Sequence, residues 1–180
     1  MTPAAVYGLA ASALIIGAAA TLLPWRHRRG LGAVVALVTL PTLAPWLHGI
    51  LGAPSFTLCQ LALLRLLAPE RAPFAGRGPA LALAAFAAVF YPLALGLGPV
   101  DPFALGYRPL PLLAALVPLG LWLARRRQAA WLILIGGDLA AYALGLFDNL
   151  WNACFDPLLV GLAVVRLVRR SQRDTASTMS

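Results

Sequence analysis

Lysine is absent from this 180-residue sequence, glutamate occurs once, and only 11% of the residues are charged. Soluble domains contain about 25% charged residues, so the deficit indicates that lipid surrounds much of the chain. The hydrophobic share of 61% and the mean hydropathy of +0.84 agree with this interpretation. Two histidines and two cysteines are too few for haem or a multinuclear metal site. We therefore expect an integral membrane protein without a cofactor or a bound metal.

Several common enzyme motifs are also missing. The sequence has no HExxH, no GxSxG and no glycine-rich loop before a lysine. The formal net charge of +8 comes from fourteen arginines, which form short clusters between apolar runs. That spacing is typical of a signal for membrane topology and not of a nucleic-acid-binding face with interleaved aromatic residues. We therefore exclude nucleic acid as a partner.

Apolar stretches follow one another along almost the whole chain. They lie at about 3–24, 31–51, 55–68, 79–98, 109–124, 129–147 and 150–168. A helix of about 20 residues crosses roughly 30 Å of hydrocarbon, and the shorter stretches can span if terminal arginines reach the interface. We predict an all-α bundle of about seven transmembrane helices, forming one domain over residues 1–170. Residues 171–180 are polar and are expected to form a disordered cytoplasmic tail.

The arginines also predict the orientation of these helices. With the N-terminus outside, seven spans place every arginine except Arg108 on the cytoplasmic side, as the positive-inside rule requires. The basic cluster RHRR follows the first apolar stretch, which favours a retained helix over a cleaved signal peptide. A six-span alternative, with 31–68 as a re-entrant element, would put Arg125–Arg127 outside and is rejected. We expect a multi-pass protein of a bacterial inner membrane, with a periplasmic N-terminus and a cytoplasmic C-terminus.

After the first helix, the chain is consistent with three helical hairpins, at about 31–68, 79–124 and 129–170. The outer ends of the last two both contain ALGL followed by Asp-Pro. Such repeats occur in transporters, with the site between them, although Ala/Leu-rich helices also resemble one another by chance. Aspartate before proline also starts helices well, because the carboxylate accepts free N–H groups and proline has none. We expect Asp156 to open the last helix and Asp101 a short outer-loop helix.

Asp138 falls at the middle of the predicted span 129–147. A carboxylate at that depth costs at least about 2.5–3.5 kcal/mol on insertion scales, so it should face the interior of the bundle. Its candidate neighbours are small or polar, namely Gly136, Gly137, Tyr142, Gln60 and Arg65. Two interpretations remain open at this point. Asp138 belongs either to a proton- or cation-linked site or to a hydrogen-bonded tie between helices.

A second polar group is predicted at the outer ends of the helices, at nearly one depth. It contains His48, Asp101, Tyr107, Arg108, Asp148, Asn149, Trp151, Asn152 and Asp156. Tryptophan at this depth fits the interfacial aromatic belt, and Asp and Asn are common turn residues. The residues predicted to bind a substrate are Asp138, Tyr142, Gln60, Asp101, Arg108, Asn149 and Asn152. Cys59 and Cys154 are expected to be packed thiols, with an outer-side disulfide as the alternative.

Two segments resemble motifs of intramembrane proteases. The sequence IGGDLAAY is similar to the GxGD motif of prepilin and presenilin-type aspartyl proteases, but Ile135 replaces the first glycine and an earlier helix offers no second aspartate. The sequence FDNLWNACFDPLLVG is similar to the outer-face segment of lipoprotein signal peptidases, but their Asp-Arg and Asn-x-Ala-Asp elements are absent. We carry neither assignment over to this chain.

The expected function is therefore that of a non-catalytic membrane protein. It would be a small solute carrier or an accessory subunit of a membrane complex, with the Asp138 site opening to the outer face. Its partners would be the lipid bilayer and either a small solute or another membrane protein. The alternative is an intramembrane enzyme that acts on a lipid or lipid-linked substrate at the outer leaflet. In that case His48 with Asp148 or Asp156 would provide general acid and base groups.

Overall fold

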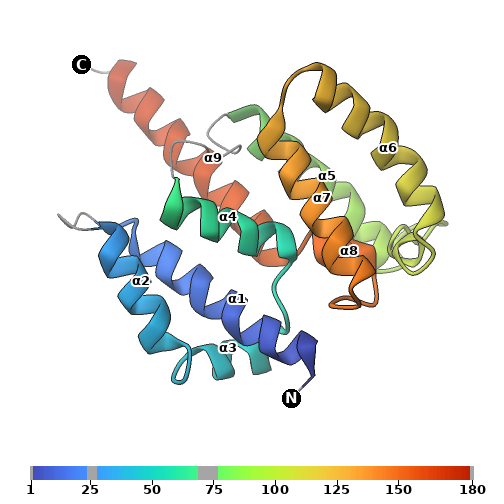
Figure 1. The fold of residues 1–180 in the computed structure, drawn as a ribbon. Helices are drawn as coiled ribbons and strands as arrows, with labels where there is room; N and C mark the ends of the chain where they lie inside the picture. Colours follow the sequence, from blue (N-terminus) through green and yellow to red (C-terminus); the bar gives the residue numbers. More distant parts are fainter. Residues whose placement is uncertain (1, 24–27, 69–76, 179–180) are drawn as a thin grey trace.

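The computed structural model describes residues 2–23, 28–68 and 77–178, which form helices and turns without a strand (Figure 1). The predicted all-α class is thereby confirmed. The helices are α1 (Pro3–Ala20), α2 (Arg28–Thr39), α3 (Ala44–Leu51), α4 (Phe56–Leu67), α5 (Arg77–Ala94), α6 (Leu110–Arg125), α7 (Ala129–Ala143), α8 (Leu150–Cys154) and α9 (Pro157–Thr178). A short 3-10 helix, η3 (Phe103–Gly106), lies between α5 and α6.

Fewer helical segments are long enough to cross a membrane than the seven predicted. Among the described residues, three qualify by length and composition, namely α1, α5 and the segment Leu150–Val168. A bent pair formed by α2 and α3 makes a fourth if it counts as one span. Helices α4, α6 and α7 are apolar but have 12, 16 and 15 residues, short of the roughly 20 that a span needs. Among the described residues, three or four of the seven predicted spans therefore qualify by length and composition.

Proline explains one of the missing spans. The predicted span 31–51 is interrupted between Thr39 and Ala44, and the two helical pieces meet at 72°. Pro41 lies in this interruption and Pro45 at the start of α3. Proline lacks the N–H that an interior helical position donates, and its ring clashes with the preceding turn. The apolar composition alone therefore overestimated the length of a continuous helix.

The repeated sequence ALGL is a repeated helix stop. Gly96 after α5 and Gly145 after α7 have φ of 83° and 72°, a region that favours glycine. The amides of Gly96 and Leu97 bond to carbonyls three and five residues back, and those of Gly145 and Leu146 do the same. This pair of bonds is the Schellman motif, which satisfies the last carbonyls of a helix. The internal similarity thus has a local structural cause.

The helices do not pair as three consecutive hairpins. Helix α1 packs against α2, α3 and α4, whereas α7 packs against α4, α6 and α8 (Figure 1). Helix α5 packs along α9, which follows it by more than sixty residues, and not along its neighbour α6. Ala87 and Phe90 of α5 are buried with Phe155 in one cluster, and this contact accounts for the pairing. The predicted hairpin 79–124 is therefore replaced by a long-range contact.

The backbone of α9 continues to Thr178, into the segment for which the sequence predicts a disordered tail. The residues from Ser171 to Thr178 contain neither proline nor glycine, the two strongest helix breakers. The polar composition that indicated disorder is therefore compatible with an extension of the last helix.

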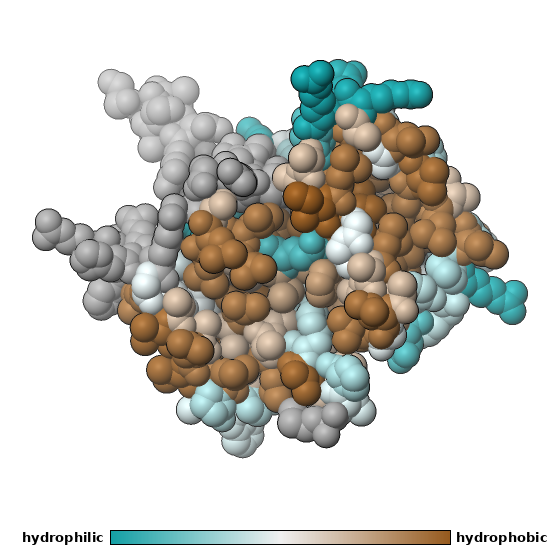
Figure 2. Space-filling view, viewed as in Figure 1, coloured by the Kyte–Doolittle hydropathy of each residue, from teal (hydrophilic) through white to brown (hydrophobic). Residues whose placement is uncertain are grey.

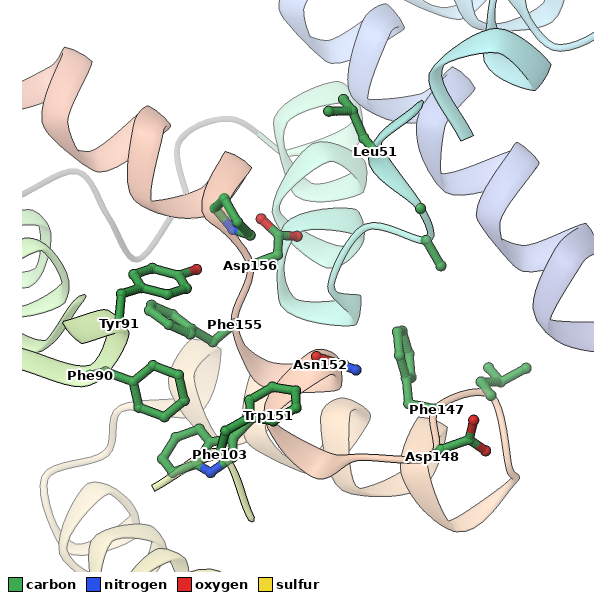
Figure 3. A pocket seen from close by; sticks show the side chains of 14 residues that line it. Leu51, Phe90, Tyr91, Phe103, Phe147, Asp148, Trp151, Asn152, Phe155 and Asp156 are labelled. Atoms are coloured by element: carbon green, nitrogen blue, oxygen red, sulfur yellow. The ribbon is translucent and has the colours of Figure 1, made fainter. Parts of the chain in front are cut away.

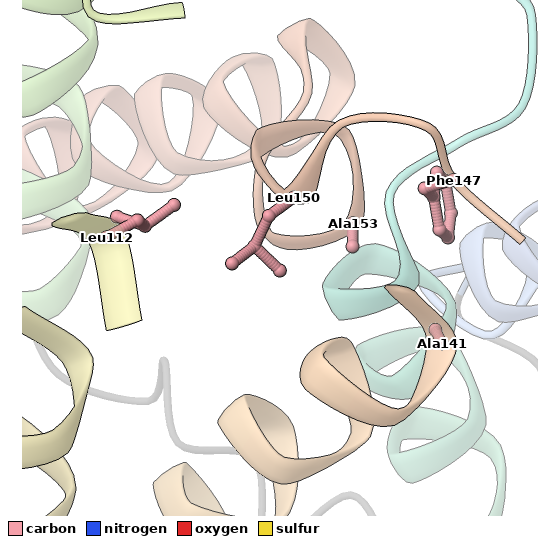
Figure 4. Packing of buried hydrophobic residues seen from close by; sticks show 5 residues of the cluster. All are labelled: Leu112, Ala141, Phe147, Leu150 and Ala153. Carbon is pink, nitrogen blue, oxygen red and sulfur yellow. The ribbon is translucent and has the colours of Figure 1, made fainter. Parts of the chain in front are cut away.

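The buried apolar residues form small clusters instead of one large core. One cluster joins α4, α7 and α9 through Leu58, Leu61, Leu134 and Leu159. Another surrounds α8 and comprises Leu112, Ala141, Phe147, Leu150 and Ala153 (Figure 4). Much of the surface is also apolar (Figure 2), and large side chains such as Trp46, Ile50 and Leu97 are exposed by 73%, 77% and 78%. An apolar surface of this extent marks a site of membrane or protein contact.

Candidate functional site

The buried carboxylate of Asp138 connects α7 to α4. Asp138 is only 3% exposed. The Thr57 hydroxyl donates a hydrogen bond to Oδ2 at 2.6 Å, and the Gln60 amide Nε2 donates to Oδ1 at 3.1 Å. The same amide nitrogen lies 3.0 Å from the carbonyl oxygen of Leu134, one turn before Asp138. Two neutral side chains of α4 therefore satisfy both carboxylate oxygens.

Gly137 makes room for this contact. A Cβ atom at position 137 would lie 2.5 Å from the Gln60 side-chain oxygen and 2.9 Å from its nitrogen. A Cβ atom at Gly136 would meet no atom within 4 Å. The close helix approach expected from the two glycines therefore depends on Gly137 alone, and it allows Gln60 to reach Asp138.

The remaining surroundings of Asp138 are also neutral. The Cys154 thiol of α8 lies close to the carboxyl group. Arg65 turns the other way, and its Nε donates to the Thr21 hydroxyl at 3.1 Å, at the end of α1. Tyr142 packs with the cluster around α8 and makes no hydrogen bond to Asp138. Within the described part of the chain, Asp138 therefore has hydrogen-bond donors but no ion pair.

Asp156 joins the starts of two helices. Its Oδ1 accepts a hydrogen bond from the Leu159 amide at 2.7 Å, so the predicted capping of α9 is confirmed. Its Oδ2 accepts from the Ser55 amide, and Ser55 in turn caps α4 by accepting from the Leu58 amide. Thr57, which binds Asp138, lies two residues beyond Ser55. The first turn of α4 therefore contacts both the interior carboxylate of Asp138 and the carboxylate of Asp156 at the start of α9.

A set of hydrogen bonds fastens α8 to η3. Asn149 is fully buried, with its side-chain nitrogen 3.0 Å from the Phe103 carbonyl and its oxygen 2.9 Å from the Trp151 amide. The Trp151 indole donates to the Pro102 carbonyl at 2.9 Å. A short helix does follow Asp101, but its N-cap is Pro102, and Asp101 accepts from the Phe103 amide at 2.9 Å from one residue further back. Asn149 and Asp101 thus hold the backbone together in this region.

A pocket of about 400 Å³ opens where these loops meet (Figure 3). Six aromatic side chains contribute to its lining, namely Phe90, Tyr91, Phe103, Phe147, Trp151 and Phe155. Its polar side chains include Asp148, Asn152 and Asp156, and Leu51 with the following Gly-Ala segment closes one side. Four members of the predicted outer group, namely Asp148, Trp151, Asn152 and Asp156, therefore come together in one concave site, whose volume is in the range of small-molecule sites.

Other members of the predicted outer group lie elsewhere. Asp101, Tyr107 and Arg108 are exposed and do not line the pocket. His48 packs against Gly8 of α1, and its Nδ1 is buried without a hydrogen-bond partner. In the described chain His48 makes neither a hydrogen bond nor an ion pair with an aspartate. The structure therefore does not bring together the acid and base groups of the enzyme alternative.

Sequence reasoning missed several polar contacts of the site. Thr57 precedes Gln60 by three residues, so the two side chains share one face of α4, and this spacing could have identified Thr57. The contact between Cys154 and Asp138 had no comparable signal, because it depends on how α8 folds back. Cys59 and Cys154 are both free thiols, as the first expectation had it, and the Cys59 thiol forms a hydrogen bond with Tyr7.

Fold and site define an all-helical protein with apolar helices, an apolar surface and a small polar interior. Residues 21–42 match the family described as the Opacity-associated protein A N-terminal motif. This segment contains the basic cluster RHRR and the whole of α2, and it is far too short to show membership of the family. No curated protein and no solved structure significantly matches the chain.

Proposed function

We propose that the protein is a small, non-catalytic integral membrane protein of the bacterial inner membrane that carries a solute. The solute enters through the outer-face pocket, and Asp138 is the ionisable group of the carrier. The single observation that best supports this proposal is the first turn of α4. Ser55 binds Asp156 at the pocket, and Thr57 binds Asp138 in the interior. A change at the pocket is therefore transmitted to the buried carboxylate through one short, continuous backbone segment.

The surroundings of Asp138 favour a mobile counter-charge. A carboxylate inside a membrane protein is expensive and usually pairs with an opposite charge or binds an ion or proton. Arg65, the basic residue that the sequence offered as an intramembrane neighbour, bonds to Thr21 instead. Hydroxyl and amide donors remain in place whether or not the carboxyl group holds a proton. Such a setting suits a group that is loaded and unloaded during transport.

Currents recorded from proteoliposomes on a solid support test this proposal. The perfused solutes are choline, alanine and glucose, each with and without a pH gradient. Wild-type protein should give a transient current with at least one solute, and Asp138→Asn should fold normally and give none. The carrier proposal is wrong if Asp138→Asn matches the wild type or if no solute produces a current.

An accessory-subunit role is the second candidate, supported by the donors that satisfy both oxygens of Asp138. In that case Asp138 only ties α4 to α7. The expected signature is a failure of Asp138→Asn to insert or assemble, with no solute-dependent current from the wild type.

A further inference from the structure

We propose that the outer-face pocket binds a small organic ammonium ion. This inference deepens the proposed function by giving the chemical class of its solute. The pocket combines aromatic rings with carboxylates in a chain of strongly positive net charge. Two of the six acidic residues of the sequence, Asp148 and Asp156, line it, and the described residues of its lining include no arginine or histidine. An anionic ligand would meet only like charge there, whereas a cation meets attraction.

The aromatic rings form a fixed wall with part of its surface open. Phe90 and Phe155 are buried at 4% and 7% exposure, with ring centroids 5.3 Å apart. In front of them, Tyr91 stacks on Phe155 at 5.2 Å and Trp151 meets Phe90 edge to face at 4.9 Å. Tyr91 and Trp151 are only partly buried. Partly open ring surfaces attract ammonium groups, especially quaternary ones, through the negative face of the ring.

The polar groups around this wall suit the same ligand. Asp148 is exposed at the rim, and Asp156 lies across the pocket beside the start of α9 (Figure 3). The Tyr91 hydroxyl is buried without a hydrogen-bond partner and points to the side that carries Asp156. A carboxylate next to apolar walls attracts a cation more strongly than it would in water.

An inorganic divalent cation fits the site less well. Calcium needs six to eight oxygen ligands, and the described residues contain no group of three or more metal-binding acidic, histidine or cysteine side chains. Both oxygens of Asp156 already accept backbone amides. The volume of about 400 Å³ lies within the usual range for a small organic ligand.

Isothermal titration of the full chain in phosphatidylglycerol nanodiscs tests this inference. The probe is choline, and its uncharged counterpart is 3,3-dimethylbutanol, in which carbon replaces the quaternary nitrogen. Choline should bind at least tenfold more tightly than the alcohol. Equal binding of the two compounds, or no binding of choline, would overturn the inference.

Two variants locate the site. Asp148→Asn removes a charge from the rim without breaking a hydrogen bond inside the fold, and it should weaken choline binding about fivefold. Asp101→Asn removes the same charge outside the pocket and keeps an amide oxygen for the Phe103 amide, so it should leave binding unchanged. An equal loss of choline affinity in both variants would show that choline responds only to the net charge of the protein, and it would overturn the site. Trp151→Leu serves as a second pocket variant and should also weaken binding, with folding checked by circular dichroism.

The ammonium group could belong to a free solute or to a lipid headgroup. Repeating the titration in phosphatidylcholine nanodiscs separates the two sources. Unchanged choline binding in phosphatidylcholine identifies a free solute as the ligand. Loss of choline binding there indicates that the lipid headgroup already occupies the site and identifies a lipid as the ligand. Both results agree with the ammonium site. Choline binding without transport currents would refute the carrier and keep the pocket. Currents with alanine or glucose, together with no binding of choline, would keep the carrier and refute the ammonium site.

Discussion

Thr57 Oγ1 lies 2.6 Å from Asp138 Oδ2, across the interface of α4 and α7. With the Gln60 amide on the other oxygen, this contact makes one buried carboxylate the polar centre of an apolar bundle. Thr57 also lies two residues from Ser55, whose amide donates to Asp156 at the aromatic pocket. The consequences of this arrangement are measurable.

Replacement of Asp138 should separate its hydrogen bonds from its charge. Asp138→Asn keeps an oxygen for the Gln60 amide, and the Thr57 hydroxyl is able to rotate and accept a hydrogen bond from the new amide. Asp138→Leu leaves the Thr57 hydroxyl without its acceptor and leaves the Gln60 amide with the Leu134 carbonyl alone, and an unsatisfied buried polar group costs about 1–3 kcal/mol. Thermal unfolding in detergent, followed by circular dichroism, should therefore give a near wild-type Tm for Asn and a clearly lower one for Leu. Equal Tm values for Leu and the wild type would show that the contact does not stabilise the fold.

Gly137 and Gly136 form a matched pair for the fit of Gln60. Gly137→Ala places a methyl group against the Gln60 amide and should destabilise the protein by about 1–3 kcal/mol, the range for overpacking. Gly136→Ala meets no atom and should be neutral or stabilising by up to about 1 kcal/mol, since alanine favours the helix. Both are compared by thermal unfolding in the same detergent. The opposite order of stability would contradict the described approach of α4 to α7.

Asn149 should matter for stability, whereas the nearby Asn152 should not. Asn149→Ala removes the cap of α8 and the bond to the Phe103 carbonyl, which together are worth about 1–3 kcal/mol. Asn152 is exposed, so Asn152→Ala should change stability by at most about 0.5 kcal/mol. Limited proteolysis and thermal unfolding of the two variants provide the comparison. If Asn149→Ala were as stable as Asn152→Ala, the tie between α8 and η3 would not hold the pocket wall in place.

The local features of the fold could be predicted from the sequence. Asp156 caps α9, Gly137 permits a close contact and Gln60 reaches Asp138, because each depends on a spacing of a few residues or on the chemistry of one side chain. The pairing of α5 with α9 could not be predicted in this way. Their Ala/Leu-rich faces resemble those of the other helices, so composition does not specify the partner.

The number of spans and the pocket were missed for related reasons. Hydropathy measures the affinity of a stretch for lipid, but Pro41 and Gly145 decide where its helix ends. The pocket wall draws Phe90 and Tyr91 from α5, Phe103 from η3 and Trp151 from α8. The wall therefore depends on the packing of three separate elements, and no residue spacing in the sequence predicts that packing.

We propose that the protein is an integral membrane protein whose carboxylate-lined pocket opens to the outer face. The most direct measurement is labelling of intact cells with a membrane-impermeant maleimide, in variants with one introduced cysteine and with Cys59 and Cys154 replaced by alanine. Asn152→Cys lies at the pocket and should be labelled in intact cells. Gln128→Cys, between α6 and α7, should be labelled only after the membrane is permeabilised. Labelling of Gln128→Cys alone in intact cells, or of both variants alike, would contradict the proposed orientation of the pocket.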